Sequence, residues 1–243
     1  MPGAPKIYFN GCSQVENGHL ALETDNWIEQ SWPWLLAHHL NLSEYRNDAI
    51  SLGSNNRILR TTIDAILEYH PDIVIIGLTE PSRIELPVAN GDRCRINVHH
   101  CNTDNGSTSY QYQTNWFKKH HNNWLTFIST LQIVYQLKML KQVHGFRLYL
   151  FNAVSDNYFE SWEQLLPDSF NVAHNRQPWR SKEDQQLVQR LLDEIKNLNW
   201  LLPWDDNLYT TVTNKKWATD KFGHAALDSQ SAVAELLLQG IDK

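Results

Sequence analysis

A serine near the start of the sequence and a histidine near its end could form a nucleophile and its base. Ser13 follows a short apolar run, and His224 comes four residues after Asp220. A serine hydroxyl is a poor nucleophile until a base takes its proton, and histidine suits that task at neutral pH. An aspartate near the histidine can fix its tautomer and stabilise the imidazolium. These residues predict attack by Ser13, with His224 as base and Asp220 as supporting acid.

Two other residues compete for these roles. Asp228 also lies close to His224 in sequence, although an aspartate at that place would equally cap the last predicted helix. Cys12 precedes Ser13, and a thiol is intrinsically reactive, but no partner for it is evident, and we expect a small buried residue there.

Three loops that follow predicted strands carry small or polar residues. They are Gly11-Cys12-Ser13, Gly53-Ser54-Asn55-Asn56 and Gly77-Leu78-Thr79-Glu80. Because ligands of open parallel sheets bind outside the carboxyl ends of the strands, we expect these loops to meet at one edge. The backbone N–H groups of Ser13 and Gly53 could then stabilise an oxyanion.

Several common site types are absent from the sequence. There is no G-x-G-x-x-G fingerprint, no phosphate-binding G-x-x-x-x-G-K-[ST], no H-E-x-x-H and no G-x-S-x-G elbow. Cys94 and Cys101 flank His99 and His100, but zinc sites more often use tighter cysteine pairs. We therefore expect neither a metal nor an organic cofactor.

Composition excludes other classes of protein. The formal net charge is −6, from 27 acidic and 21 basic residues, whereas a nucleic-acid binder more often has a basic face. No stretch is long and apolar enough for a membrane span, and the first residues do not form a signal peptide. We expect no nucleic-acid or membrane partner and synthesis in the cytoplasm. The oligomeric state does not follow from the sequence.

The elements that must position these residues alternate between strand and helix. Predicted strands cover residues 6–10, 48–52, 72–76 and 147–152. Predicted helices cover residues 32–40, 56–70 and 124–143, with one opening at Ser181 and one following Asp228. This order predicts one α/β domain over residues 1–243, with a parallel sheet covered on both faces and a long insertion at 81–120.

Four stretches resemble, in family order, the sequence blocks of SGNH (GDSL-like) hydrolases. They are Asn10 to Ser13 (block I), Asn47 to Ser54 (block II), Asp72 to Glu80 (block III) and Asp220 to His224 (block V). Cys12 replaces the usual aspartate of block I, Thr79 replaces the oxyanion-hole asparagine of block III, and Asp220 lies one residue farther from the histidine than is usual. The pattern is also similar to bacteriophage members of the family.

The resemblance implies a three-layer α/β/α sandwich, flavodoxin-like, with a parallel sheet of about five strands. It implies a catalytic triad of Ser13, Asp220 and His224, and an oxyanion hole formed by Ser13, Gly53 and Thr79. If the Thr79 hydroxyl does not donate, Asn55 and Asn56 are the next candidates. Arg83, just beyond block III, is expected to be an exposed loop residue.

The expected reaction is hydrolysis of a small ester, with the acyl group on a carbohydrate or a similar molecule, through an acyl-serine intermediate. Two alternatives stay open. The first is a non-catalytic glycan-binding or virion-associated protein with the same fold. The second is a transacylase, in which a sugar hydroxyl replaces water.

Overall fold

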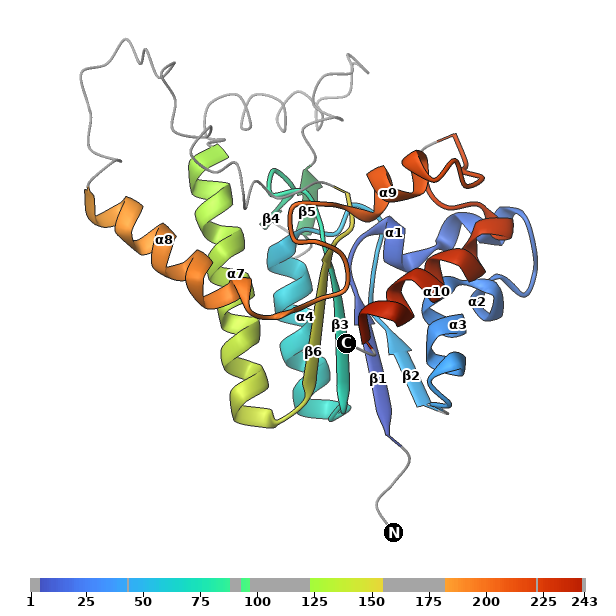
Figure 1. Ribbon diagram of the computed structural model, residues 1–243, viewed down its shortest axis with the longest axis horizontal. Coiled ribbons are helices and arrows are strands. Elements are labelled where there is room, and N and C mark those ends of the chain that lie inside the picture. Colours follow the sequence, from blue (N-terminus) through green and yellow to red (C-terminus); the bar gives the residue numbers. More distant parts are fainter. Residues whose placement is uncertain are drawn as a thin grey trace.

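Five parallel strands form the centre of the molecule (Figure 1). The computed structural model describes residues 5–42, 44–87, 93–96, 123–154, 182–221 and 223–241. The sheet has the order β2-β1-β3-β6-β7. Its strands are β1 (Lys6–Asn10), β2 (Glu44–Asn47), β3 (Ile73–Leu78), β6 (Arg147–Asn152) and β7 (Asn199–Trp200). The predicted sheet of about five parallel strands is confirmed.

Helices cover both faces of this sheet, as the alternation of elements predicts. One face carries α4 (Asn55–Glu68), α7 (Asn123–His144) and α8 (Lys182–Lys196). The other carries α3 (Trp32–His39) and α10 (Gln230–Ile241). Figure 1 shows these two groups on either side of the strands, which makes the fold a three-layer α/β/α sandwich.

The apolar run in β3 shows why a central strand must be hydrophobic on both sides. Val74 and Ile76 pack into the core beneath α4 and α7, whereas Ile73 and Ile75 pack into the core beneath α3 and α10. Successive side chains of a strand point to opposite faces, so a strand covered twice has no polar positions.

The predicted second strand at 48–52 is wrong. The strand lies earlier, at Glu44–Asn47, and pairs in parallel with β1. Its residues are polar and only partly buried because β2 is an edge strand, so they lack the apolar pattern of a core strand. Residues 48–52 instead form a turn in which Leu52 has a φ of 61°.

The predicted insertion at 81–120 is not loop throughout. It contains β4 (Ile84–Pro87) and β5 (Arg93–Ile96), which pair antiparallel. Residues 88–92 and 97–120 of the insertion lie outside the described residues, and so do His99, His100, Cys101 and the helix start at Ser181. Gly77, which we expected to end a strand, lies inside β3.

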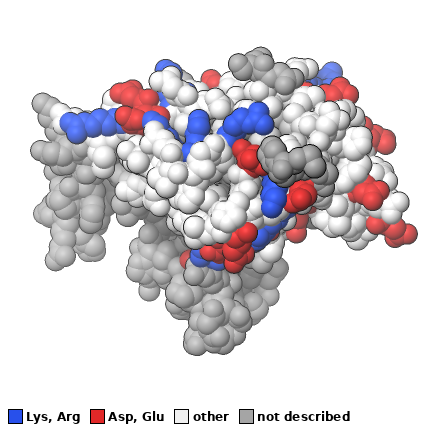
Figure 2. Space-filling view, turned by 90° about the horizontal axis from the view of Figure 1, so that it is seen from below, with Lys and Arg blue, Asp and Glu red and all other residues white. Residues whose placement is uncertain are grey.

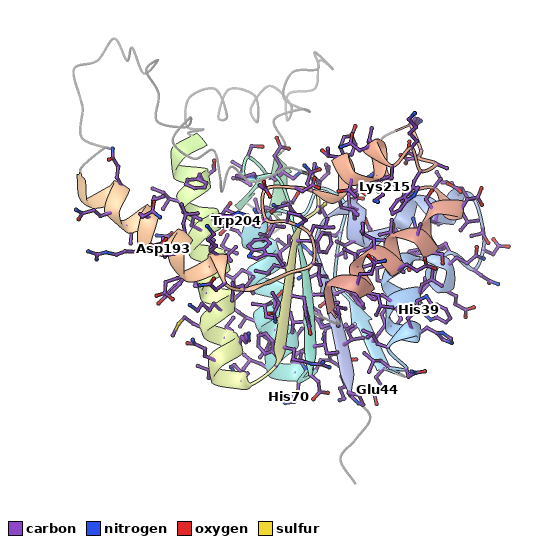
Figure 3. The ribbon with its side chains drawn as sticks, viewed as in Figure 1. His39, Glu44, His70, Asp193, Trp204 and Lys215 are labelled. Atoms are coloured by element: carbon purple, nitrogen blue, oxygen red, sulfur yellow. The ribbon has the colours of Figure 1, made fainter. Side chains whose placement is uncertain are left out.

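All strands of the main sheet run in the same direction, so one edge collects their carboxyl ends. Glu44, which begins β2, and His70, just before β3, lie at the lower edge in Figure 3, so the carboxyl ends point toward the top. Figure 2 views the lower side, where acidic and basic side chains are interspersed in the described part of the surface. Within the described residues, no helix is both long and apolar enough to cross a bilayer.

Candidate active site

Ser13 and His224 meet at the carboxyl edge of the sheet. Ser13 is the first residue of α1 (Ser13–Glu16), which begins three positions after β1 ends. The Nε2 atom of His224 lies 2.9 Å from the Ser13 Oγ, and its Nδ1 atom lies 2.9 Å from the Asp220 Oδ2. The structure therefore brings the three predicted residues into one chain of hydrogen bonds. The His224 and Asp220 side chains are 15% and 17% exposed, so the chain lies near the surface.

A tight backbone turn holds Asp220 and His224 together. The His224 N–H donates to the Asp220 Oδ1 at 2.9 Å, and the Asp220 N–H donates to the His224 carbonyl at 2.9 Å. Gly223 in this turn has a φ of 80°, a left-handed conformation that favours glycine. The turn explains how an aspartate four residues before the histidine can still contact its ring.

A second histidine, at a position that no sequence motif marks, lies against the first. The rings of His19 and His224 are stacked, with centroids 4.8 Å apart and an interplanar angle of 20°. His19 belongs to the 3-10 helix η1 (Gly18–Leu22), and its Nε2 atom lies 3.1 Å from the Ala225 carbonyl oxygen. No spacing rule connects residues 19 and 224, so only the fold reveals this contact.

The three predicted loops do meet, and their glycines show how closely. A Cβ atom on Gly53 would lie 3.0 Å from the Gly11 carbonyl oxygen, and one on Gly11 would lie 3.0 Å from that of Gly77. Such contacts are tighter than most that real side chains make, so a larger residue at either glycine would force the crossing backbone to shift. This packing places the residues after β1 beside those after β3 and before α4.

The two predicted backbone donors of the oxyanion hole differ in their surroundings. Within the described part of the chain, the Ser13 N–H has no hydrogen-bond partner, as expected at the first position of a helix. The Gly53 N–H instead donates to the Ile50 carbonyl at 2.9 Å. Gly53 could serve an oxyanion only if that turn bond is shared or released.

Thr79 is fully buried, and its hydroxyl has no hydrogen-bond partner among the residues that the structure describes. Its backbone is fixed by Asn55, whose Oδ1 accepts from the Thr79 N–H at 2.9 Å and whose Nδ2 donates to the Thr79 carbonyl at 3.0 Å. The Asn55 amide is thus committed to structure, and Asn56 is exposed on α4. Thr79 therefore stays the first choice among these three candidates, because its hydroxyl is not already committed to a hydrogen bond within the described residues.

The competing candidates lie elsewhere. Asp228 is exposed in η3 (Leu227–Ser229), while Cys12 is a free cysteine that is completely buried. Arg83 is only 8% exposed, and its Nε lies 3.9 Å from a Glu80 carboxylate oxygen. The expectation of an exposed loop arginine is therefore wrong, because a bend after β3 turns this residue inward.

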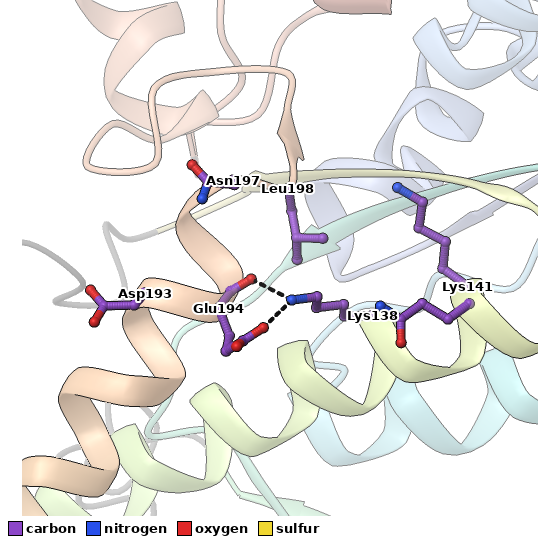
Figure 4. A pocket seen from close by; sticks show the side chains of 7 residues that line it. Lys138, Lys141, Asp193, Glu194, Asn197 and Leu198 are labelled. Carbon is purple, nitrogen blue, oxygen red and sulfur yellow. Dashed lines mark hydrogen bonds and ion pairs between the residues drawn. The ribbon is translucent and has the colours of Figure 1, made fainter.

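A surface hollow of about 340 Å³ lies between α7 and α8 (Figure 4). Lys138 bridges the two helices, pairing with the Glu194 carboxylate and donating to the Glu194 carbonyl at 3.0 Å. Figure 1 places these helices at the opposite end of the molecule from α1 and α9 (Leu208–Asn214). We interpret this hollow as a gap between surface helices.

Comparison with known proteins gives a family and a fold. The profile of one family, described as a family of unknown function (DUF6071), matches residues 22–170. This match includes Gly53 and Thr79 but neither Ser13 nor the Asp220–His224 turn. No curated protein matches the sequence.

Three solved structures are similar over nearly the whole chain. TesA is 14% identical, with a TM-score of 0.51 and 97% of each chain covered. The psychrotrophic esterase EstA from Pseudoalteromonas sp. is 12% identical, with a TM-score of 0.50 and coverage of 98% of this chain and 96% of EstA. A catalytic mutant of Axe2, an acetylxylan esterase from Geobacillus stearothermophilus, is 13% identical, with a TM-score of 0.50 and coverage of 100% and 97%. The fold is that of the SGNH hydrolases.

Proposed function

This chain belongs to DUF6071, a family of unknown function, so its activity must be inferred from the site, and we propose that it is a serine ester hydrolase of the SGNH type. The observation that carries the proposal is the continuous path from the Ser13 Oγ to the His224 Nε2 and from the His224 Nδ1 to the Asp220 Oδ2, both 2.9 Å. In such an arrangement the Ser13 proton can pass to the His224 Nε2, while the Asp220 carboxylate orients the ring and stabilises the imidazolium.

In the proposed reaction, the Ser13 Oγ attacks the ester carbonyl while the His224 Nε2 takes the serine proton. The carboxylate of Asp220 stabilises the imidazolium through Nδ1. Collapse of the tetrahedral intermediate passes that proton to the departing alcohol and leaves an acyl group on Ser13. Water then attacks the acyl-serine with His224 again as base, which releases the acid and restores the serine.

The oxyanion of both steps is proposed to accept from the Ser13 N–H, the Gly53 N–H and the Thr79 hydroxyl. Within the described residues, the Ser13 N–H and the Thr79 hydroxyl make no hydrogen bond. Each can therefore still donate to an oxyanion, which supports the assignment of these two donors. The Gly53 N–H must share or leave its bond to Ile50 as the oxyanion forms.

We propose a small acyl ester as substrate, with the acyl group carried by a carbohydrate or a similar alcohol. Two of the structures with this fold are esterases, one of them acting on acetylxylan, which supports an acetyl group as the first one to test. No cofactor is needed for this chemistry.

A serine-directed probe tests the nucleophile. Wild-type protein should gain one fluorophosphonate adduct by intact-protein mass spectrometry, and Ser13→Ala should gain none, because only Ser13 has a base within hydrogen-bond distance of its hydroxyl among the proposed site residues. Hydrolysis of 4-nitrophenyl acetate should disappear in the same variant. An adduct that persists in Ser13→Ala would exclude Ser13 as nucleophile.

One observation favours the alternative of a glycan-binding or virion-associated protein without activity. The Gly53 N–H is engaged and the Thr79 hydroxyl is inaccessible, so the proposed oxyanion hole is not open in this conformation. Binding of acetylated xylo-oligosaccharides without release of acetate, equally by wild type and Ser13→Ala, would establish that alternative. Transfer of the acyl group to an added sugar alcohol would instead indicate a transacylase.

A further inference from the structure

The stacked histidine adds a third metal-binding side chain to the proposed acid–base pair. His19, Asp220 and His224 each offer one ligand atom, and these atoms all lie within 4.8 Å of one another. All three side chains are partly exposed, so an ion from solution can reach them. The proposed hydrolytic mechanism uses only two of the three.

The donor set suits zinc. Two imidazoles and one carboxylate are ordinary Zn²⁺ ligands, and three protein ligands leave a fourth position for water. Bond lengths of about 2.0 Å with tetrahedral angles separate the ligand atoms of one zinc ion by roughly 3.3 Å. The His224 Nδ1 and Asp220 Oδ2 atoms are already 2.9 Å apart, so this half of a site is nearly formed.

His19 must move to complete the site. Its ring is stacked nearly parallel to that of His224, so the in-plane lone pairs of the two rings do not converge. The ring must tilt out of the stack and release the Ala225 carbonyl, which costs one partly exposed hydrogen bond. His19 lies in a 3-10 helix of five residues, so a side-chain rotation there disturbs no long element.

We propose that Zn²⁺ binds His19, Asp220 and the Nδ1 atom of His224, and that it thereby switches off the hydrolase. The inhibitory half of this inference rests on the proposed function, whereas the binding half does not. The site is distinct from a cofactor site, because the bound ion opposes the chemistry.

The tautomer of His224 explains the inhibition. For His224 to accept the serine proton, Nε2 must carry a lone pair, so the proton of the neutral ring must reside on Nδ1. A zinc ion that binds Nδ1 takes the place of the proton on that nitrogen, and the proton moves to Nε2. The ring stays neutral and no proton is lost, but an Nε2–H facing the Ser13 Oγ can no longer act as a base.

Calorimetric titration with zinc chloride tests the binding half on the full chain. His19→Phe keeps an aromatic ring against His224 and removes the nitrogen ligand. His38→Phe is the matched control, because His38 also stacks on an aromatic ring, that of Trp34, but lies on the exposed side of α3. Wild type and His38→Phe should bind one more zinc ion than His19→Phe, or should bind it more than about 100-fold more tightly. The loss of a partner outside the ligand set typically weakens metal binding by only about 10- to 100-fold.

A second measurement uses Co²⁺ in place of zinc. The change in its visible absorption spectrum between the free and the bound ion should depend on His19 in the same way. If wild type and His19→Phe bind zinc alike, or wild type binds none, the proposed site does not exist.

Rates of 4-nitrophenyl acetate hydrolysis test the inhibitory half. Each variant is compared with its own rate in the presence of a chelator, so a change in basal activity does not matter. Zinc should inhibit wild type and His38→Phe but not His19→Phe. Binding that depends on His19 without any inhibition would overturn the tautomer argument. Binding that depends on His19 in a protein without any esterase activity would leave the site standing and refute the proposed function.

Discussion

Asp220 and Asp228 are eight positions apart, but only one of them contacts the histidine. The Asp220 carboxylate bonds both the ring and the backbone N–H of His224, whereas Asp228 is exposed. We expect Asp220→Asn to lower kcat for 4-nitrophenyl acetate by up to about 10⁴-fold, because an amide favours the wrong histidine tautomer. Asp228→Asn should change kcat little. The opposite ranking would assign the acid to Asp228.

A substitution at Thr79 is expected to lower activity without lowering stability. Its buried hydroxyl has no partner within the described part of the chain, so Thr79→Val should not lower the free energy of unfolding measured in urea. If the hydroxyl donates to the oxyanion, the same change should reduce kcat on the order of 10²-fold with little effect on KM. Thr79→Asn should then retain or raise activity. A fully active Thr79→Val would leave the two backbone donors as the whole oxyanion hole.

At the residue scale, the sequence predicted contacts that depend on residue type and local spacing. Ser13 and the Asp220–His224 turn stand in stretches that resemble family blocks, and the structure brings their side chains within hydrogen-bond distance. The partner of Asn55 and the stacking of His19 could not be predicted in this way. Both are contacts between distant segments that no local pattern records.

The turn that carries Asp220 and His224 depends on Gly223. Alanine there would be strained at a φ of 80°, and its Cβ would lie 2.2 Å from a ring carbon of Tyr209. We expect Gly223→Ala to lose about 1 kcal/mol or more of unfolding free energy and to lower kcat, because relief of the strain opens the turn. Urea denaturation and esterase rates on fully folded protein measure the two effects.

Gly145 provides the matched control. It follows α7 with a φ of 77°, yet a Cβ there would meet nothing within 4 Å. Gly145→Ala carries the same backbone strain far from the site but without the clash, so it should lose less stability than Gly223→Ala and keep its kcat. Equal losses of kcat in both glycine variants would mean that the turn has no special role.

At the element scale, clear hydrophobic patterns predicted the right strands and helices, whereas elements without such a pattern were missed or misplaced. The strands at 6–10 and 147–152 match the observed β1 and β6, because buried strands must be apolar. The edge strand β2 is polar, and β7 has only two residues, so neither carries a readable period. The short helix α1, which presents Ser13, is four residues long and is likewise invisible to a helical pattern.

The stability of the whole molecule should fall at alkaline pH through a tyrosine in the core. Burial, and then the nearby charge of Asp48, raise the pKa of Tyr8 far above its ordinary value. The folded state therefore holds the Tyr8 proton more tightly than the unfolded chain does. Its contribution is complete below the unfolded pKa of about 10 and is lost as the pH rises above it, by up to about 1.4 kcal/mol per pH unit.

Urea midpoints between pH 8 and pH 11 measure this slope. Tyr8→Phe should make it shallower but not abolish it, since burial also raises the pKa values of Tyr45 and Tyr69. An unchanged slope in Tyr8→Phe would show that Tyr8 ionises equally in both states.

Ser13 and His224 are separated by 211 positions, so a growing chain carries the proposed nucleophile long before it carries the base. The Ser13 hydroxyl therefore lacks its hydrogen-bond partner until His224 has been translated and the two distant segments have packed together. Reaction of Ser13 with a fluorophosphonate is expected only after that long-range contact has formed. In a cell-free translation, the appearance of the adduct could then be used to time the formation of this contact.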